Sequence, residues 1–299
     1  MISMRQKESS MPHAKRSGKQ RAVFISGCSV GVGHAAALLM HRNGWRVFAG
    51  VRKLADGESL VAESQGAITP VICDVRDRKQ VFEASKQVAE QLDGAGLDGL
   101  VCNAGVGASG PIEFLDQEEL TTPIDINLYG SIYCTQAFLP LLRKAKGRII
   151  FVTSGTTVLS MPLMSTYPAS KIALELLGRQ LQGELKHFGI HVCVVDPGHI
   201  KSRMTLTANE TGGAARAKLP PAAEELYGDV LDAMTNMTEK MVGTGIEPEV
   251  SAQTYLRALT DEKPKAFYIA DSDAKWMRRL AKFVPESVKT AMANKVLGS

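Results

Sequence analysis

Seven short apolar runs recur along the chain, and longer amphipathic segments separate them. Most runs are nearly continuous in Val, Ile, Phe and Cys, which is typical of strands buried on both faces of a parallel sheet. They lie at 22–25, 46–51, 68–73, 99–102, 148–152, 191–195 and 266–269. Helical patterns lie between them, at about 32–43, 77–92, 117–143, 165–188 and 247–260. This alternation predicts an α/β fold, a doubly wound parallel seven-stranded sheet with helices on both faces.

One irregular region interrupts the alternation. Residues 198–221 follow the sixth run, and Thr, Gly, Ala and Asn dominate them. Parallel strands bring their carboxyl ends to one edge of the sheet, where ligands bind, so we expect a substrate loop there. The chain shows no domain-scale linker, which predicts a single domain over residues 21–299.

The two ends of the chain differ from this body. Residues 1–20 hold five basic residues and one acidic residue, which predicts a disordered basic tail, with weak polyanion binding as the alternative. Residues 271–299 predict a helical tail in which Trp276, Met277, Leu280 and Phe283 share one face. We favour packing of this face against the body or a partner subunit over contact with a membrane surface.

Composition narrows the functional classes. Hydrophobic residues make up 44% of the chain, and residues 21–299 hold 30 basic and 30 acidic residues, so we expect a buried core and no nucleic-acid partner. No apolar run reaches the ~18 residues that span a bilayer, so we expect no transmembrane segment. The start lacks a secretory pattern and five cysteines are scattered, which favours a cytoplasmic protein with reduced thiols. No Cys or His spacing suggests a metal site.

A glycine-rich turn follows the first apolar run. It reads Ser-Gly-Cys-Ser-Val-Gly-Val-Gly over residues 26–33 and leads into a helical pattern. Glycines allow the backbone to turn tightly and to approach a pyrophosphate, and the helix start supplies free N–H groups. The alternative is a turn that serves only packing. Its position between a strand and a helix favours a nucleotide site that includes Gly27, Ser29, Gly31, Val32 and Gly33.

Tyr167 and Lys171 lie about one helical turn apart and therefore share a helix face. A phenol has a pKa near 10, but a nearby ammonium favours the phenolate, so Tyr167 could exchange a proton with a substrate oxygen. A Tyr-x-x-x-Lys pattern alone is too common to indicate a site. Ser154, at the end of the fifth run, would add a hydroxyl donor to that oxygen.

Together these motifs resemble the short-chain dehydrogenase/reductase family, in its compact single-domain branch with a Rossmann-type fold. The glycine spacing resembles the family's T-G-x-x-x-G-x-G pattern, with Ser26 in place of the Thr. Ser154 lies thirteen residues before Tyr167, as the catalytic Ser of the family does. The resemblance implies that Ser154, Tyr167 and Lys171 are catalytic, and that Asn127 holds a water linking Lys171 to solvent.

The resemblance also implies cofactor contacts at three further strand ends. Asp74 and Val75 would face the adenine, and Asn103, Ala104 and Gly105 resemble the family's N-N-A-G segment, with Cys102 in place of its first Asn. Lys171 would also hold the nicotinamide ribose beside Tyr167. The segment after the sixth run resembles the family's P-G segment, and would border the nicotinamide and the phosphates through Pro197, Gly198, Ile200 and Ser202.

The end of the second run favours NADP(H) over NAD(H). An NAD site usually has Asp or Glu there, whereas this chain has Arg52 and Lys53 and no carboxylate before Asp56. Arg52 could bind a ribose 2′-phosphate, and Ser29 could add a hydroxyl donor. The alternative is that both cations are ordinary solvated residues.

Two residues depart from a simple reading of these motifs. Pro168 lies inside the helical pattern, so we expect it to distort the local turn. His199 lies in the P-G segment, where a general base is conceivable, but we favour an ordinary loop residue.

The C-terminal part resembles the hydroxysteroid and retinol dehydrogenase-like branch, which implies a lipophilic substrate of steroid, retinoid or polyketide type. A pocket or core packing could equally account for six apolar residues: Val158, Leu159, Met161, Leu163, Met164 and Met204.

We expect the reaction to be carbonyl–alcohol interconversion. The alternatives are an NAD-dependent secondary-alcohol dehydrogenase and a non-catalytic NADP(H) sensor. A sugar-nucleotide epimerase or dehydratase is disfavoured by the glycine spacing. The resemblance also implies a homodimer or homotetramer formed through 117–143 and 165–188.

Overall fold

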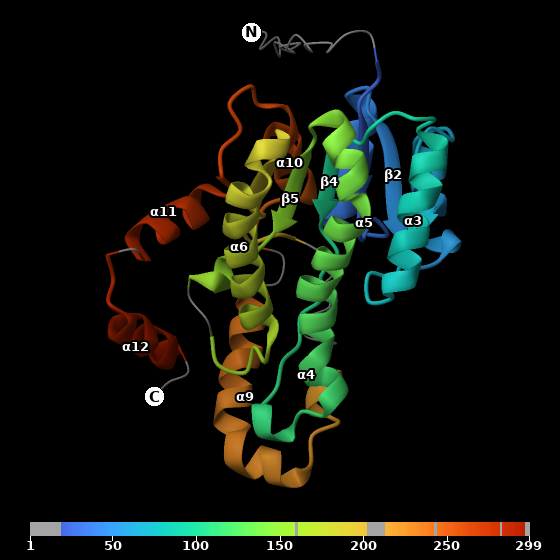
Figure 1. The fold of residues 1–299 in the computed structure, drawn as a ribbon. Helices are drawn as coiled ribbons and strands as arrows, with labels where there is room; N and C mark the ends of the chain where they lie inside the picture. The colour runs from blue at the N-terminus through green and yellow to red at the C-terminus, as the bar shows by residue number, and fades with distance from the viewer. Residues whose placement is uncertain (1–18, 159–160, 202–212, 242–243, 282, 297–299) are drawn as a thin grey trace, which may run out of the picture.

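A seven-stranded, all-parallel sheet forms the centre of the molecule (Figure 1). The computed structural model describes residues 19–158, 161–201, 213–241, 244–281 and 283–296. The strands are β1 (Ala22–Ile25), β2 (Arg46–Val51), β3 (Thr69–Ile72), β4 (Gly99–Cys102), β5 (Arg148–Val152), β6 (His191–Asp196) and β7 (Phe267–Ile269). Their order is β3-β2-β1-β4-β5-β6-β7, so the winding direction reverses between β1 and β4. The predicted doubly wound sheet is confirmed, and its switch point lies beside the glycine-rich turn.

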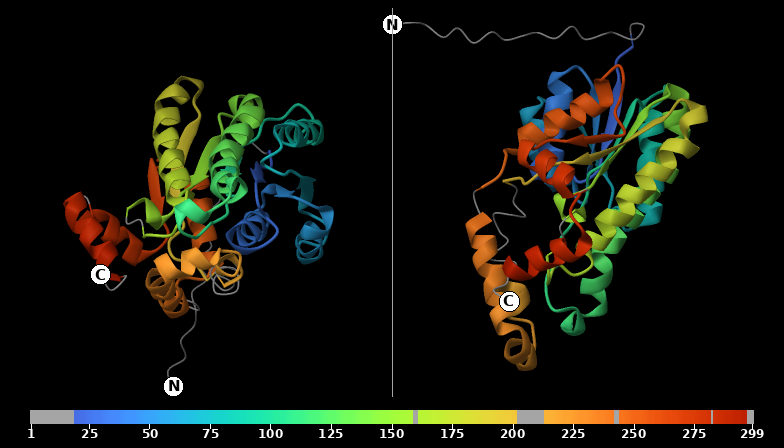
Figure 2. Two further views of the ribbon diagram at one scale, coloured as in Figure 1. Left: turned by 90° about the horizontal axis from the view of Figure 1, so that it is seen from below. Right: turned by 90° about the vertical axis from the view of Figure 1, so that its left-hand side faces the viewer.

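Helices cover both faces of the sheet (Figure 2). One core cluster joins Phe24 and Phe48 to helices α3 (Arg78–Gln91), α5 (Gly130–Ala145) and α6 (Tyr167–Glu184). The other joins Val23 and Val47 to α1 (Gly31–Arg42), α2 (Glu58–Glu63) and α10 (Pro248–Thr260). Successive strand residues point to opposite faces, so runs that are apolar throughout supply both cores.

The helix expected at about 117–143 is present as an uninterrupted helical stretch, but its hydrogen-bonding pattern changes along its length. It divides into α4 (Gln117–Pro123), a π-helical turn η3 (Ile124–Tyr129) and α5. Pro123 has no N–H for the helical ladder, and Asn127 inside the π-helical turn bonds to groups outside the helix. Single π-helical turns often occur at functional sites, so this change of pattern points to Asn127.

The expected distortion at Pro168 is also wrong. Helix α6 begins at Tyr167, so Pro168 lies in the first helical turn and is buried. The N–H groups of a first turn have no partner within the helix, so the missing donor of a proline costs nothing there. The Tyr167-to-Lys171 stretch is therefore regular helix from its start.

Part of the region predicted as a loop is helical. Residues 202–212 lie outside the described residues, but residues 213–216 form a helical turn and α9 (Pro221–Met241) begins at the end of the expected loop. Elsewhere in the described chain, short 3₁₀ segments follow or precede the main elements: η1 (Leu54–Gly57), η2 (Ile112–Phe114), η4 (Gly155–Thr157) and η5 (Lys186–Phe188). Tyr227 of α9 packs edge-on against Phe114 and bonds Glu113, so α9 is fixed to the segment before α4. Figure 1 shows α4 and α9 extending beyond the same end of the sheet.

The C-terminal tail forms two helices, α11 (Ser272–Ala281) and α12 (Glu286–Val296), beside the body (Figure 1). The side chains of Trp276 and Phe283 are 65% and 86% exposed. The apolar face predicted for this tail is thus largely uncovered in the single chain, and its partner remains a prediction.

The described residues bear on two expectations, the absence of a membrane-spanning helix and the reduced state of the cysteines. Within the described residues, no helix combines the length and apolar character that a membrane crossing requires. All five cysteines are free and buried, as expected for reduced core residues. The homodimer or homotetramer and the cytoplasmic location stay predictions, as does disorder of the basic tail, most of which lies outside the described residues.

Candidate active site

The glycine-rich turn joins β1 to α1 at the carboxyl edge of the sheet. Gly27 and Gly31 have φ angles of +69° and +66°, which side chains rarely tolerate. A Cβ on Gly33 would lie 2.2 Å from the carbonyl oxygen of Gly27, so only glycine fits there. Helix α1 begins at Gly31 and has no acidic residue in its first turn. These features fit the negative charge of a pyrophosphate at the helix start.

Hydrogen bonds fix this turn to the end of β4. The backbone N–H groups of Asn103 and Ala104 both donate to Ser26 Oγ at 3.0 Å. The Asn103 amide in turn donates to the carbonyl oxygens of Ser26 and Gly27, at 3.0 and 3.1 Å. The hydroxyl at position 26 therefore holds two strand ends together, which explains why Ser can replace the Thr of the family pattern.

Tyr255 of α10 completes this network, a role that no sequence motif indicates. Its hydroxyl donates to Asn103 Oδ1 at 3.1 Å, and the side chain is fully buried. Burial raises the pKa of Tyr255 far above its usual range, so it stays a neutral donor. Tyr255 thereby fixes the orientation of the Asn103 amide.

Ser154 and Tyr167 meet at the carboxyl end of β5. Burial raises the pKa of Tyr167, a hydrogen bond with Ser154 lowers it, and the charge of Asp196 raises it. In the chain alone the phenol is therefore held protonated, as a proton donor to a carbonyl oxygen must be. The segment between them contains Leu163 and Ser165 in left-handed backbone conformations, at φ +60° and +50°. Such strain is often found at functional sites.

Lys171 lies one turn after Tyr167 and is buried. Its Nζ donates to the carbonyl oxygen of Val152 at 2.9 Å and lies 5.9 Å from the Tyr167 ring centroid. Burial lowers the pKa of Lys171 to about 8. The ammonium therefore lies close to the phenol, whose pKa is set mainly by burial.

Asn127 is fully buried beside Lys171, although its side chain makes other bonds. Its amide oxygen accepts from the N–H of Val106 at 2.9 Å, and its amide nitrogen donates to the Val106 carbonyl and to Ser170 Oγ. A Cβ on Gly105 would lie 3.1 Å from Lys171 Nζ and 3.2 Å from Asn127 Oδ1, so both groups meet at Gly105. The structure thus brings Asn127 to the catalytic residues, and the water relay stays a prediction.

The predicted adenine-side residues lie at the ends of β2 and β3. Asp74 pairs with Arg76 at 2.8 Å, which lowers the pKa of Asp74, and Arg52 lowers that pKa further through its charge. Arg52 is exposed. Val75 is buried and packs closely against the backbone of Gly130, where a Cβ would lie only 2.7 Å from Val75 Cγ2. Sequence reasoning missed Arg76, a second cation at this edge of the sheet.

The segment after β6 folds over the same edge. Gly198 has a φ of +77°, and Ser251 Oγ donates to the Pro197 carbonyl at 2.6 Å. Ile200 forms a parallel bridge with Ile246. His199 Nε2 lies 3.0 Å from Thr244 Oγ1 and 3.4 Å from the Met241 carbonyl oxygen, so its ring faces these two residues in the manner of a loop residue. Ser202 lies outside the described residues.

The apolar residues after Ser154 are half-buried rather than packed in the core. Val158, Met161, Leu163 and Met164 are all of intermediate exposure, and neither core cluster of the described chain includes them. A position beside the catalytic Ser and Tyr but outside the core favours the pocket interpretation over core packing. Leu159 and Met204 lie outside the described residues.

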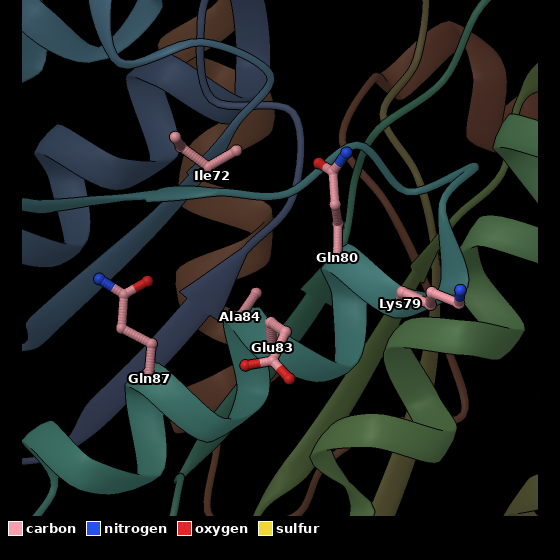
Figure 3. A pocket seen from close by; sticks show the side chains of 6 residues that line it. All are labelled: Ile72, Lys79, Gln80, Glu83, Ala84 and Gln87. Atoms are coloured by element: carbon pink, nitrogen blue, oxygen red, sulfur yellow. The ribbon is translucent and has the colours of Figure 1, made fainter.

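A shallow pocket lies elsewhere, between β3 and α3 (Figure 3). Its lining residues are Ile72, Lys79, Gln80, Glu83, Ala84 and Gln87. It contains none of the residues predicted for catalysis or cofactor binding. The chemistry described above therefore does not belong to this pocket.

The family model for short chain dehydrogenases matches residues 21–212. The chain belongs to the short-chain dehydrogenase family. Human retinol dehydrogenase 5 is 33% identical over 281 residues, covering 92% of this chain and 88% of the relative. The NADPH-dependent 3-dehydrocapnine reductase of Ornithobacterium rhinotracheale is 29% identical, covering 83% and 87%. The expected family and its retinol dehydrogenase-like branch are thereby confirmed, as is an enzyme that acts on CH–OH groups.

The fold is also that of solved members of the family. A short-chain dehydrogenase from Streptomyces avermitilis superposes with a TM-score of 0.73 at 24% identity, covering 93% of this chain and 96% of that chain. The similarity supports the Rossmann-type architecture. Within this family, the dehydrogenase reaction interconverts an alcohol and a carbonyl compound with a nicotinamide cofactor.

Removing the hydroxyl at position 26 should loosen the cofactor turn. Ser26→Ala leaves the part-buried N–H groups of Asn103 and Ala104 without their acceptor, so we expect a loss of about 2 kcal/mol in the free energy of unfolding. Ser26→Thr keeps the hydroxyl and should stay within about 1 kcal/mol of the wild type. Urea denaturation measures both, and an equal loss in the two variants would contradict this role.

The buried Lys171 should make stability depend on pH. Its pKa is about 8 in the folded chain and 10.5 when unfolded, so between these values the unfolded state binds more protons. The contribution of Lys171 to stability therefore rises with pH across this window, by up to about 3 kcal/mol. The buried thiols of Cys28, Cys73, Cys134 and Cys193, whose pKa is raised, give stability the opposite slope in every variant. Lys171→Met should therefore lose stability more steeply with pH than the wild type, whereas Lys53→Met, an exposed control, should follow the wild type. Urea unfolding from pH 7.5 to 10.5 measures the difference, and parallel curves for all three proteins would refute the assignment.

Proposed function

We propose that the chain is an NADP(H)-dependent oxidoreductase that interconverts a lipophilic ketone or aldehyde and its alcohol, with Tyr167 as the acid–base group. The observation that carries the proposal is the meeting of Ser154, Tyr167 and buried Lys171 at the carboxyl end of β5. A non-catalytic sensor would have no need of this hydrogen-bonded arrangement beside a strained segment.

The residues act in a defined order during carbonyl reduction. NADP(H), when bound, supplies the hydride. The Ser154 hydroxyl donates a hydrogen bond to the substrate oxygen, so that it shares the negative charge that develops there. The Tyr167 phenol then gives its proton to that oxygen, and the nearby ammonium of Lys171 stabilises the resulting phenolate. Oxidation of the alcohol runs through the same groups in reverse.

Charge at the ends of β2 and β3 supports NADP(H) over NAD(H). Exposed Arg52 occupies the position where an NAD site usually has an acid, and Arg76 pairs with the carboxylate of Asp74, on which Arg52 also acts through its charge. A 2′-phosphate there would meet cations rather than repulsion. One relative, the 3-dehydrocapnine reductase of Ornithobacterium rhinotracheale, is NADPH-dependent, which agrees with this preference.

The substrate class follows from the surroundings of the catalytic residues. Half-buried Val158, Met161, Leu163 and Met164 follow Ser154, and side chains of this kind suit a flexible apolar ligand. The similarity to retinol dehydrogenase 5 supports a lipophilic alcohol or carbonyl compound. An NAD-dependent secondary-alcohol dehydrogenase is the second candidate, and the cofactor test below separates the two.

Replacing the acid–base group should abolish turnover while leaving cofactor binding intact. We expect NADPH-dependent reduction of a panel of retinoid and steroid carbonyl compounds, followed at 340 nm, to fall at least about 100-fold in Tyr167→Phe. NADPH affinity, followed by fluorescence, should change less than about threefold. Tyr133→Phe, on α5, is the matched control and should retain activity. Tight NADPH binding without turnover in the wild type would favour a sensor.

Reversing the charge at position 52 should change the cofactor preference. An Arg–phosphate hydrogen bond contributes about 1.5–3 kcal/mol, so Arg52→Asp should lower kcat/KM for NADPH about 10- to 100-fold and improve the use of NADH. Arg42→Asp is the control for net charge, because Arg42 is exposed and lies at the end of α1 that is far from the glycine-rich turn. Better use of NADH than NADPH by the wild type, unchanged in Arg52→Asp, would contradict the preference.

A further inference from the structure

Arg278 of α11 reaches into the catalytic region from the C-terminal tail. Its side chain is 14% exposed, in contrast to the exposed residues on either side of it. Its guanidinium lies 4.4 Å from the Phe267 ring centroid on β7. The residue also lies beyond residues 21–212, the part of the chain that matches the family model.

The guanidinium donates to four residues from three elements: η4 with its N-cap Ser154, α6 and β6. Nη2 donates to the Ser154 carbonyl at 3.2 Å and to Thr157 Oγ1 at 2.6 Å. Nη1 donates to Glu175 on α6 at 3.2 Å, and Nε donates to Asp196 at the end of β6 at 3.2 Å. A planar guanidinium with five N–H donors can make this combination of bonds, whereas no other side chain can.

Two of these partners connect directly to the reacting groups. The Ser154 carbonyl belongs to the residue whose hydroxyl bonds Tyr167. Asp196 Oδ1 accepts from the N–H of Gly198 at 3.0 Å, at the start of the segment predicted to border the nicotinamide. Arg278 therefore fixes the catalytic Ser and the cofactor segment relative to each other.

The charges make the arrangement depend on Arg278. The side chains of Asp196 and Glu175 are 1% and 8% exposed. Arg179 also pairs with Glu175, but its side chain is 63% exposed. Burial raises the pKa of Asp196, whereas Gly198 and Arg278 lower it. Without Arg278, two buried carboxylates would face each other beside Ser154, and their repulsion would move the strand ends.

We infer that Arg278 is a positioning residue of the active site, which holds Ser154 and the 197–200 segment in register, so that the C-terminal helix α11 is a working part of the catalytic centre. The inference rests on the proposed function for its kinetic consequence. Its structural consequence stands independently of that function.

The first test is kinetic and uses the full-length protein with NADPH and the best carbonyl substrate of the panel. Arg278→Met should lower kcat at least about tenfold with KM for the carbonyl compound changed less than about threefold, because geometry in the reacting state is lost rather than binding. Arg278→Lys keeps the charge but has three donors, and should recover only part of kcat. Arg279→Met, on an exposed neighbour, should stay within twofold of the wild type.

The second test does not need turnover. Amide hydrogen exchange should accelerate at residues 153–157 and 196–200 in Arg278→Met and remain unchanged there in Arg279→Met. If Arg278→Met fails to fold, its combination with Glu175→Gln and Asp196→Asn removes the unpaired charges, and the same two measurements apply to that variant.

The outcomes separate this inference from the proposed function. Unchanged exchange, or a folded Arg278 variant with wild-type kcat, would overturn the positioning role. If the wild type shows no turnover but amide exchange still accelerates in Arg278→Met, the proposed function is overturned and the positioning role stays in place.

Discussion

The site depends on one constraint, the parallel direction of all seven strands. It brings the ends of β1, β2, β3, β4, β5 and β6 to a single edge, although these ends are spread along the sequence from Ile25 to Asp196. Each strand end then contributes one kind of group: a glycine turn, a cation, a carboxylate, an amide or a hydroxyl. Side-chain hydrogen bonds between neighbouring strand ends, such as Ser26 with Asn103, convert this proximity into fixed geometry.

The catalytic chemistry follows from the balance between burial and pairing at this edge. Burial raises the pKa of Tyr167 and lowers that of Lys171, so burial alone drives both groups towards their neutral forms. Ser154 opposes this effect at the phenol, and the Val152 carbonyl holds the ammonium in place. The site thus combines a dry environment, where charges interact strongly, with the few polar partners that keep those charges usable.

Local patterns were sufficient to predict the sheet and most of the site. Continuous apolar runs marked every strand, and the glycine spacing marked the turn, because both features are short-range. The π-helical turn has no pattern of its own, because apolar residues continue through it, so periodicity alone predicts one helix there. Helix α9 was missed because it buries only Ala223 and Leu231 within the described chain, which leaves little periodicity.

The roles of Tyr255 and Arg278 could not be predicted from local sequence patterns at all. Both act through side-chain bonds to residues more than 80 positions away, and the helices that carry them look ordinary in sequence. Such contacts exist only in the folded chain. Residues that support a site can therefore remain unseen even when the motifs that form it are complete.

The bond between Tyr255 and Asn103 spans 152 positions, and this span affects how the protein is made. During synthesis the glycine turn, β1 and β4 leave the ribosome long before α10 does. The Asn103 amide then lacks the partner that orients it, and α10 has not yet covered its face of the sheet. The nascent chain should consequently expose apolar surface and bind cofactor poorly until its last fifth has emerged.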